Sequence, residues 1–148
     1  MIEFKQGNIF DQDVDVIVNP VNCVGVMGAG LAKQFKSRYP DNFTEYKKAC
    51  DAGLVRIGKG FLYRSKSSVD ILNFPTKDHW REPSQLDFIK QGMNYMVLIM
   101  RKFDYKSIAI PPLGVGLGGL DWSEVRSVLQ YGLTYLPDVH AIILGSEE

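Results

Sequence analysis

A glycine-rich stretch between a buried strand and a helix constrains the fold of this chain most strongly. Residues 14–18 (VDVIV) are apolar almost throughout, as in a strand that is covered on both faces at the centre of a sheet. The sequence NPVNCVGVMGAGLAKQF follows at residues 19–35, and from Ala29 its apolar residues recur at helical spacing until Pro40. A strand, a loop and a helix in this order are typical of an α/β fold.

Segments with strand and helix periods alternate along the rest of the chain. A short helix is predicted over residues 43–50, and two longer helices are predicted to begin at the capping residues Ser84 and Asp121 and to reach about Phe103 and Leu136. The other strands are predicted at residues 2–5, 60–64, 70–74, 107–110 and 140–144. About six strands and four helices in 148 residues fit one domain.

The composition excludes several classes of protein. The 17 basic and 17 acidic side chains cancel, so the chain lacks the cationic excess with which proteins hold long nucleic acids. Cys23 and Cys50 have neither metal-ligand nor CxxC spacing, and we expect no metal and no cofactor. Because the sequence shows no leader and no long apolar run, it predicts a reduced, cytoplasmic protein without membrane contact, and we expect a monomer.

Two glycine-rich loops each lie between a predicted strand and a predicted helix. The first contains Gly25, Gly28 and Gly30, and the second is PPLGVGLGG at residues 111–119. Open α/β sheets bind ligands beyond the carboxyl ends of their strands, which is where these loops lie. Glycine lets backbone amides approach an anion, and the amino end of a helix attracts it. The loops predict an extended ligand with phosphates between them; the alternative is that the glycines serve only tight turns.

Gly114, Gly116 and Gly119 also spell GxGxxG, the fingerprint of Rossmann dinucleotide sites. That site needs a second strand that ends in an acidic residue about 20 positions later, followed by further strand–helix units. Only one more strand is predicted after this loop. Neither loop continues into Lys and Ser or Thr, as a Walker loop does. Both familiar nucleotide motifs are therefore excluded.

Three separate stretches, NPVNCVGVMGAGLAKQF, NFPTKDHWR and SIAIPPLGVGLGGLDW, together resemble the macrodomains, and within them the DarG-type branch that also includes the terminal ADP-ribose glycohydrolases. The resemblance extends from GNIF at residues 7–10 to the last predicted strand. It implies a single macrodomain over residues 1–148, with a three-layer α/β/α sandwich around a mixed central sheet of about six strands. It also implies that the two glycine loops bind ADP-ribose.

The resemblance assigns the parts of ADP-ribose to positions in this chain. It implies that adenine lies near Gly7, Asn8 and Ile9, and that the distal ribose faces Asn22 and Lys77. The residues implied to surround the diphosphate are Gly25, Val26, Met27, Gly28, Gly30, Leu113, Gly114, Val115, Gly116, Leu117 and Gly118.

Two positions depart from patterns seen in related families. Asn8 stands where many macrodomains have Asp, and its amide oxygen can still accept a bond from the adenine amino group, without the charge. Gly118 stands where eukaryotic terminal ADP-ribose glycohydrolases have an acid that helps to release a lysine adduct. Asp121 lies three residues later, as in DarG-like sequences, and is either a catalytic residue or the cap of the helix that follows.

Lys77 is the side chain expected to carry the chemistry, together with Asn22. A lysine amine attacks carbon only when neutral, so its pKa would have to fall through burial or through nearby positive charge from His79 and Arg81. Alternatively, Lys77 stays an ammonium and polarises the departing group. Asn22 can hydrogen-bond ribose hydroxyls through both ends of its amide, or it can form an Asx turn after the second strand.

The function implied by the resemblance is removal of ADP-ribose from a modified nucleobase, thymidine in single-stranded DNA, as in the DarG-type antitoxins. The expected partners are ADP-ribose, ADP-ribosylated single-stranded DNA and a cognate ADP-ribosyltransferase toxin. His79 and Trp80 are candidates for contact with the base, and the alternative is that Trp80 closes an edge of the core. Two other functions stay open, namely removal of ADP-ribose from protein carboxylates and non-hydrolytic binding of ADP-ribose.

Overall fold

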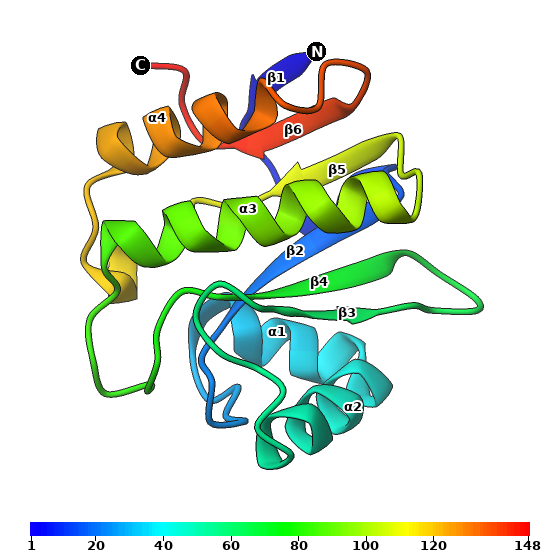
Figure 1. The fold of residues 1–148 in the computed structure, drawn as a ribbon, viewed down its shortest axis with the longest axis vertical. Coiled ribbons are helices and arrows are strands. Elements are labelled where there is room, and N and C mark those ends of the chain that lie inside the picture. The colour runs from blue at the N-terminus through cyan, green and yellow to red at the C-terminus, as the bar shows by residue number, and fades with distance from the viewer.

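The sheet at the centre of the molecule has six strands in the order β1-β6-β5-β2-β4-β3 (Figure 1). The computed structural model describes all residues from 1 to 148. Its strands are β1 (Ile2–Lys5), β2 (Val16–Val21), β3 (Phe61–Tyr63), β4 (Asp70–Pro75), β5 (Ser107–Ile110) and β6 (His140–Leu144). All neighbours pair in parallel except β3, which is antiparallel to β4. The predicted mixed sheet is confirmed, and β2 lies inside it, as its apolar sequence indicates.

Helices cover both faces of the sheet and complete the three layers that were expected. They are α1 (Gly30–Arg38), α2 (Pro40–Asp51), α3 (Leu86–Lys102) and α4 (Trp122–Leu133), with two short 3-10 helices in loops, η1 (Ile9–Asp11) and η2 (Gly116–Gly118). Because strand residues point alternately to the two faces, Val16 and Val18 pack with α3 and α4, whereas Ile17 packs with Phe35 of α1. Apolar burial on both faces therefore holds the layers together. No helix combines the length and the apolar character that a membrane span needs.

Several element ends differ from the sequence prediction. The prediction that Ser84 caps a helix is wrong, because α3 begins after Gln85 and no side chain caps it. Ser84 is buried instead, and its backbone N–H donates to the carbonyl of Gly118 at 3.0 Å. α2 begins earlier than predicted, at Pro40, because proline suits the first turn of a helix. α4 ends at Leu133, three residues before the predicted end.

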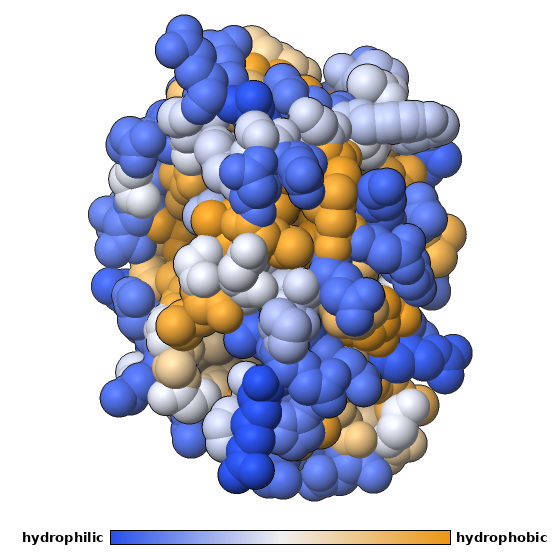
Figure 2. All heavy atoms as spheres, turned by 90° about the vertical axis from the view of Figure 1, so that its left-hand side faces the viewer, coloured by the Kyte–Doolittle hydropathy of each residue, from blue (hydrophilic) through white to orange (hydrophobic).

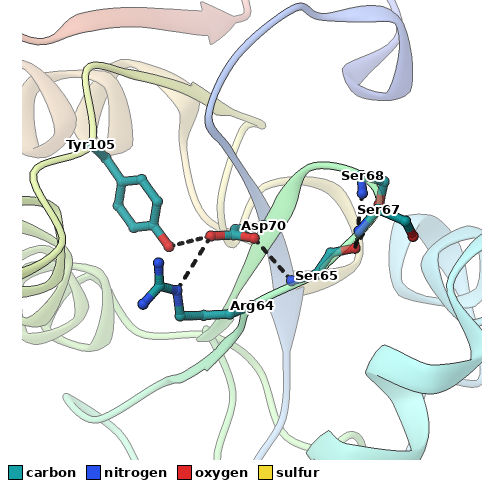
Figure 3. Close-up of polar contacts among 6 residues, drawn as sticks. All are labelled: Arg64, Ser65, Ser67, Ser68, Asp70 and Tyr105. Carbon is teal, nitrogen blue, oxygen red and sulfur yellow. Dashed lines mark hydrogen bonds and ion pairs between the residues drawn. The ribbon is translucent and has the colours of Figure 1, made fainter.

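Two aspartates close the edge of the sheet at which the parallel strands begin. Asp70, at the start of β4, accepts hydrogen bonds from the Tyr105 hydroxyl and from the backbone N–H of Ser65, and Arg64 lies 3.7 Å away (Figure 3). Asp15, which precedes β2, accepts two backbone N–H groups at the start of β5, at 2.7 and 3.2 Å. The chain's own donors therefore satisfy both carboxylates at this amino edge.

The opposite edge, at which β2, β4 and β5 end, carries the two glycine loops. The pairing of β2 with β4 continues past the ends of the strands. The backbone N–H of Thr76 donates to the carbonyl of Val21 at 2.9 Å, and the backbone N–H of Cys23 donates to the carbonyl of Asp78 at 3.1 Å. The first glycine loop is thereby held beside the segment that contains Lys77. We call this side of the sheet the carboxyl edge.

Candidate functional site

A cleft of about 940 Å³ opens at the carboxyl edge, bordered by the two glycine loops and the segment that follows β4. Figure 2 shows this side of the molecule, where hydrophobic residues gather in the middle and hydrophilic residues surround them. The cleft is large enough for a small-molecule ligand. Its lining residues are Pro20, Val21, Asn22, Val26, Gly28, Ala29, Gly30, Leu31, Ala32, Thr76, Lys77, Trp80, Arg81, Glu82, Pro83, Pro111, Pro112, Gly114, Val115, Leu117 and Gly118.

Asn22 shapes the first glycine loop from inside. Its Oδ1 accepts the N–H of Val24 at 3.0 Å, and its Nδ2 donates to the carbonyl of Val26 at 2.8 Å. Tyr46 of α2 donates its hydroxyl to the Asn22 carbonyl at 2.7 Å and lies 3.0 Å from Oδ1. Asn22 therefore forms the Asx turn that the sequence allows, and it also lines the cleft. The second hydrogen of Nδ2 has no partner in the chain.

The amino end of α1 offers free backbone donors at the cleft. No side chain caps this helix at its N-cap residue Ala29, and the N–H groups of residues 28–32 donate to no other group in the chain. Gly30 has a φ of +57°, a conformation that glycine adopts without strain. Free N–H groups and the helix dipole together favour an anion at this end of α1.

The second loop offers a comparable set of donors. Gly114, Gly116 and Gly119 have φ angles of +77°, +73° and +81°, and the N–H groups of residues 116–118 form no hydrogen bond within the chain. Successive free amides in such a turn form an anion-binding nest. The two loops approach each other, because a Cβ added at Gly30 would lie only 3.4 Å from Leu117 Cδ1. Two sets of backbone donors therefore border one cleft.

Lys77 lies on the cleft wall just beyond β4 and is half-buried. Its Nζ donates to the carbonyl of Leu117 in the second loop at 3.3 Å. None of the five ion pairs in the molecule includes Lys77. The amine therefore reaches across the cleft without a carboxylate partner.

Neither position 118 nor Asp121 places a carboxylate in the cleft. A Cβ at Gly118 would lie 2.6 Å from Ser84 Oγ, so any side chain there would have to displace Ser84. The hydroxyl of Ser84 is buried without a hydrogen-bond partner. Asp121 does not line the cleft; it accepts the N–H of Glu124 at 3.3 Å and caps α4. The capping role considered for Asp121 is therefore the one that the geometry supports.

His79 and Trp80 stack on each other beside the cleft, with ring centroids 5.4 Å apart and ring planes 29° from parallel. Trp80 lines the cleft and is 46% exposed, whereas His79 does not line it. Trp80 therefore does not close an edge of the core. The pair presents aromatic surface next to Lys77.

The residues implied to hold adenine lie outside the cleft lining. Gly7 and Asn8 are exposed, Ile9 is buried, and the three form the entry into η1. Asn8 Oδ1 accepts the N–H of Phe10 at 2.9 Å, so one of its lone pairs is already used inside the chain.

Four implied diphosphate residues also lie outside the cleft lining. Met27 and Leu113 are buried in the core, and Gly25 and Gly116 supply backbone turns with positive φ. The sequence gives no separate signal for the other lining residues, namely Pro20, Val21, Ala29, Leu31, Ala32, Thr76, Glu82, Pro83, Pro111 and Pro112. All of them except Glu82 and Pro83 lie within the three motif stretches.

The two cysteines lie near the first loop and are not reactive. Burial raises the pKa of the Cys23 thiol to about 12, and the charge of Asp78 adds to this effect. Burial also raises the pKa of Cys50 and of Tyr46. These groups stay neutral at physiological pH, so none supplies a thiolate nucleophile. No three His, Cys, Asp or Glu side chains gather where they could hold a metal ion.

Relatives in sequence point to one family. The Macro domain family model matches residues 18–129 of this chain. A DNA ADP-ribosyl glycohydrolase from Mycobacterium tuberculosis is 48% identical over 146 residues, which are 97% of this chain and 42% of that protein. The chain thus spans about two fifths of the length of this relative.

Solved structures agree with the sequence relatives. The macrodomain of Mycobacterium tuberculosis DarG superimposes with a TM-score of 0.94 at 48% identity, over 97% of this chain and 96% of that one. Thermosipho africanus DarTG in complex with ADP-ribose superimposes with a TM-score of 0.92 at 35% identity, over 99% of this chain and 42% of that one. The span matched by the family model contains both glycine loops and Lys77, and the chain therefore belongs to the macro domain family.

Proposed function

We propose that this chain is an ADP-ribosyl glycohydrolase of the DarG type, which removes ADP-ribose from a modified nucleobase, thymidine in single-stranded DNA. The observation that carries the proposal is the 48% identity, over 97% of the chain, with a DNA ADP-ribosyl glycohydrolase. The cleft supports it, because it combines backbone amides that are free to bind an anion with a lysine that has no carboxylate partner. Residues 1–148 act as a single macrodomain in this proposal.

The diphosphate of ADP-ribose is proposed to lie between the N–H groups of residues 28–32 and those of residues 116–118. These amides have no acceptor in the chain, so they could donate hydrogen bonds to phosphate oxygens without breaking an existing bond. These hydrogen bonds would stabilise the phosphate charge, and the proposal includes no metal and no cofactor. Adenine is proposed to lie near Gly7, Asn8 and Ile9. There the second lone pair of Asn8 Oδ1 would accept a hydrogen bond from the adenine amino group.

The distal ribose is proposed to face Lys77 and Asn22. A bound ligand would take the place of the Leu117 carbonyl as the hydrogen-bond acceptor of the Lys77 amine. The free N–H of Asn22 Nδ2 would donate to a ribose hydroxyl. Two roles for Lys77 remain in competition. As a neutral amine it would attack the ribose carbon that carries the base, the bond from that carbon to the base would break, and water would then release ADP-ribose from the lysine. As an ammonium it would stabilise charge on the departing base while water attacks the same carbon.

The modified base is proposed to contact His79 and Trp80. Aromatic rings stack on nucleobases with little demand for overall positive charge, which suits a chain whose charges cancel. Replacing Trp80 with Ala should slow release of ADP-ribose from DNA much more than it weakens binding of free ADP-ribose. Equal losses in the two measurements would place Trp80 inside the ADP-ribose pocket.

The biological setting follows from the same proposal. A DarG-type enzyme would act in the cytoplasm, as a monomer, on DNA that a cognate ADP-ribosyltransferase toxin has modified. The transferase would thus be a partner through its product. Genome neighbourhood and co-purification with such a transferase would test this setting.

The test of the proposed function is incubation of the chain with two substrates side by side. One is a single-stranded oligonucleotide with one ADP-ribosylated thymidine, and the other is a protein ADP-ribosylated on glutamate. The proposal expects release from DNA and none, or far slower release, from protein. Release from protein alone would identify a carboxylate hydrolase. Tight binding of ADP-ribose without release from either substrate would identify a non-hydrolytic binding module.

A further inference from the structure

We propose that Arg81 binds the phosphate backbone of single-stranded DNA next to the modified base, and so selects DNA as the substrate. This inference rests on the proposed function and adds a residue that recognises the strand itself. It starts from the turn between β4 and α3, which places Arg81 beside Lys77 in the cleft lining.

The turn is fixed by its own hydrogen bonds. The N–H of Glu82 donates to the carbonyl of His79 at 3.0 Å, and the N–H of Arg81 donates to His79 Nδ1 at 3.1 Å. Trp80 and Arg81 therefore occupy the two central positions of a closed turn, and both are exposed. The turn therefore exposes the side chains of Trp80 and Arg81 next to each other in the cleft lining.

The guanidinium of Arg81 is held in place and has no anionic partner. Its central carbon lies 4.6 Å from the centroid of the Trp80 ring, and Arg81 belongs to none of the five ion pairs. Stacking on an aromatic ring pre-organises the guanidinium and leaves its N–H fork free at the edges. The charged residues in the cleft lining are Lys77, Arg81 and Glu82, so Arg81 is the exposed cation of this surface apart from the proposed catalytic amine.

A DNA phosphate fits this group better than other anions do. A guanidinium fork matches the oxygens of a phosphate in a bidentate geometry. If the modified thymidine lies against His79 and Trp80, its own 5′ or 3′ phosphate lies within reach of Arg81, the next residue of the turn. An acidic peptide would also offer negative charge, but it would not use the aromatic surface that lies beside Arg81. One local cation also suffices where the total charge of the chain is zero.

The test compares two substrates that differ only in flanking phosphates. ADP-ribosylated thymidine nucleoside has none, whereas a single-stranded oligonucleotide with one ADP-ribosylated thymidine has them on both sides. The ratio of kcat/KM for the oligonucleotide to kcat/KM for the nucleoside is measured in wild type, Arg81→Ala, Arg81→Lys and Arg64→Ala. Arg64 is the matched control, because its guanidinium lies 4.4 Å over the Phe103 ring at the opposite edge of the sheet.

The inference expects Arg81→Ala to lower this ratio about tenfold, the size of a lost charge-assisted hydrogen bond, with a smaller loss in Arg81→Lys. Arg64→Ala should keep the wild-type ratio. The salt dependence of kcat/KM on the oligonucleotide should also become shallower in Arg81→Ala, by about 0.7 in log–log slope, as for one lost contact to single-stranded phosphate.

Two results would overturn the role of Arg81 while the wild type still releases ADP-ribose from DNA. One is an unchanged ratio in Arg81→Ala, and the other is an equal fall in Arg64→Ala. Loss in Arg81→Ala of release from glutamate-modified protein, with the DNA ratio unchanged, would assign Arg81 to a protein substrate. A wild type that is inactive on both DNA substrates would refute the proposed function itself, and this inference with it.

Discussion

The two edges of the central sheet belong to the same strands and differ in how their polar groups are satisfied. At the amino edge, Asp15 and Asp70 accept hydrogen bonds from backbone N–H groups and from Tyr105. At the carboxyl edge, the N–H groups of residues 28–32 and 116–118 have no acceptor in the chain. Polar groups are left open in folded proteins mainly where water or a ligand completes them. The amino edge therefore stabilises the fold, and the carboxyl edge leaves its donors open to solvent or to a ligand.

Replacing Lys77 with Ala should have the largest effect, and it should act on turnover. In either proposed role the amine contributes in the transition state, so kcat should fall at least about a hundredfold while ADP-ribose affinity changes far less. Single-turnover kinetics and calorimetry measure the two quantities. Equal losses in kcat and affinity would make Lys77 a binding residue only.

The variant Lys77→Arg distinguishes the two roles of the amine. A guanidinium keeps the charge but stays protonated, so it cannot act as a nucleophile. Full activity in Lys77→Arg would leave the electrostatic role as the better account. Loss as complete as in Lys77→Ala would favour attack by the amine.

At the amino edge, Asp70→Ala should reduce stability and leave turnover near the wild-type value. The change removes the acceptor of the Tyr105 hydroxyl and of the Ser65 N–H, and the Asp70 side chain is only 13% exposed. The free energy of unfolding should fall by about 2 kcal/mol, as expected for buried donors left without partners. Denaturant titration measures it, with Asp51→Ala as a control, since that carboxylate is 64% exposed and pairs only with Lys47 on the surface. A large loss of turnover in folded Asp70→Ala would break the division between the edges.

Gly116→Val tests the second loop at the carboxyl edge. Gly116 has a φ of +73° with no atom within 4 Å of an added Cβ, so the substitution strains the loop without a clash. ADP-ribose affinity should fall at least about tenfold, or about 1.4 kcal/mol. Gly53→Val is the matched control, because Gly53 has a φ of +72° and equally open surroundings away from the cleft. Unchanged affinity in Gly116→Val would contradict the two-loop site.

The smallest expected effect is that of Asp121→Ala. Because Asp121 caps α4 through the N–H of Glu124, its loss should cost about 1 kcal/mol of stability. Turnover should stay close to the wild-type value. Thermal unfolding and initial rates measure both, and a collapse of turnover at unchanged stability would restore Asp121 as a catalytic residue.

The sequence predicts the strands of the sheet and the two glycine loops well, but it does not predict the contacts between distant residues at the two edges. Strands such as β2 are recognisable because burial on both faces gives an apolar run of residues. The glycine loops are recognisable because their positive φ angles favour glycine. The Ser84 cap fails because packing against Gly118, which lies 34 positions later, outweighs the local capping pattern. The bond between Lys77 and Leu117 spans 40 positions and likewise depends on the fold.

The anchor of Asp70 at the amino edge shows the same limit. Tyr105 lies 35 positions away, and no local pattern links the two residues. The stack of Trp80 with Arg81 is local, but its position in the cleft lining follows only from the strand that precedes it. Features set by neighbouring residues can therefore be predicted from the sequence. Contacts between residues that the sheet brings together from distant positions cannot.

A crystal structure of this chain with ADP-ribose would show directly whether the two glycine loops hold the ligand. We expect the diphosphate within hydrogen-bond distance of N–H groups from residues 28–32 and from residues 116–118. We also expect the distal ribose next to Lys77, with the hydrogen bond between Lys77 and the Leu117 carbonyl replaced by one to the ligand. A diphosphate bound away from both loops, or a distal ribose that points away from Lys77, would contradict these expectations.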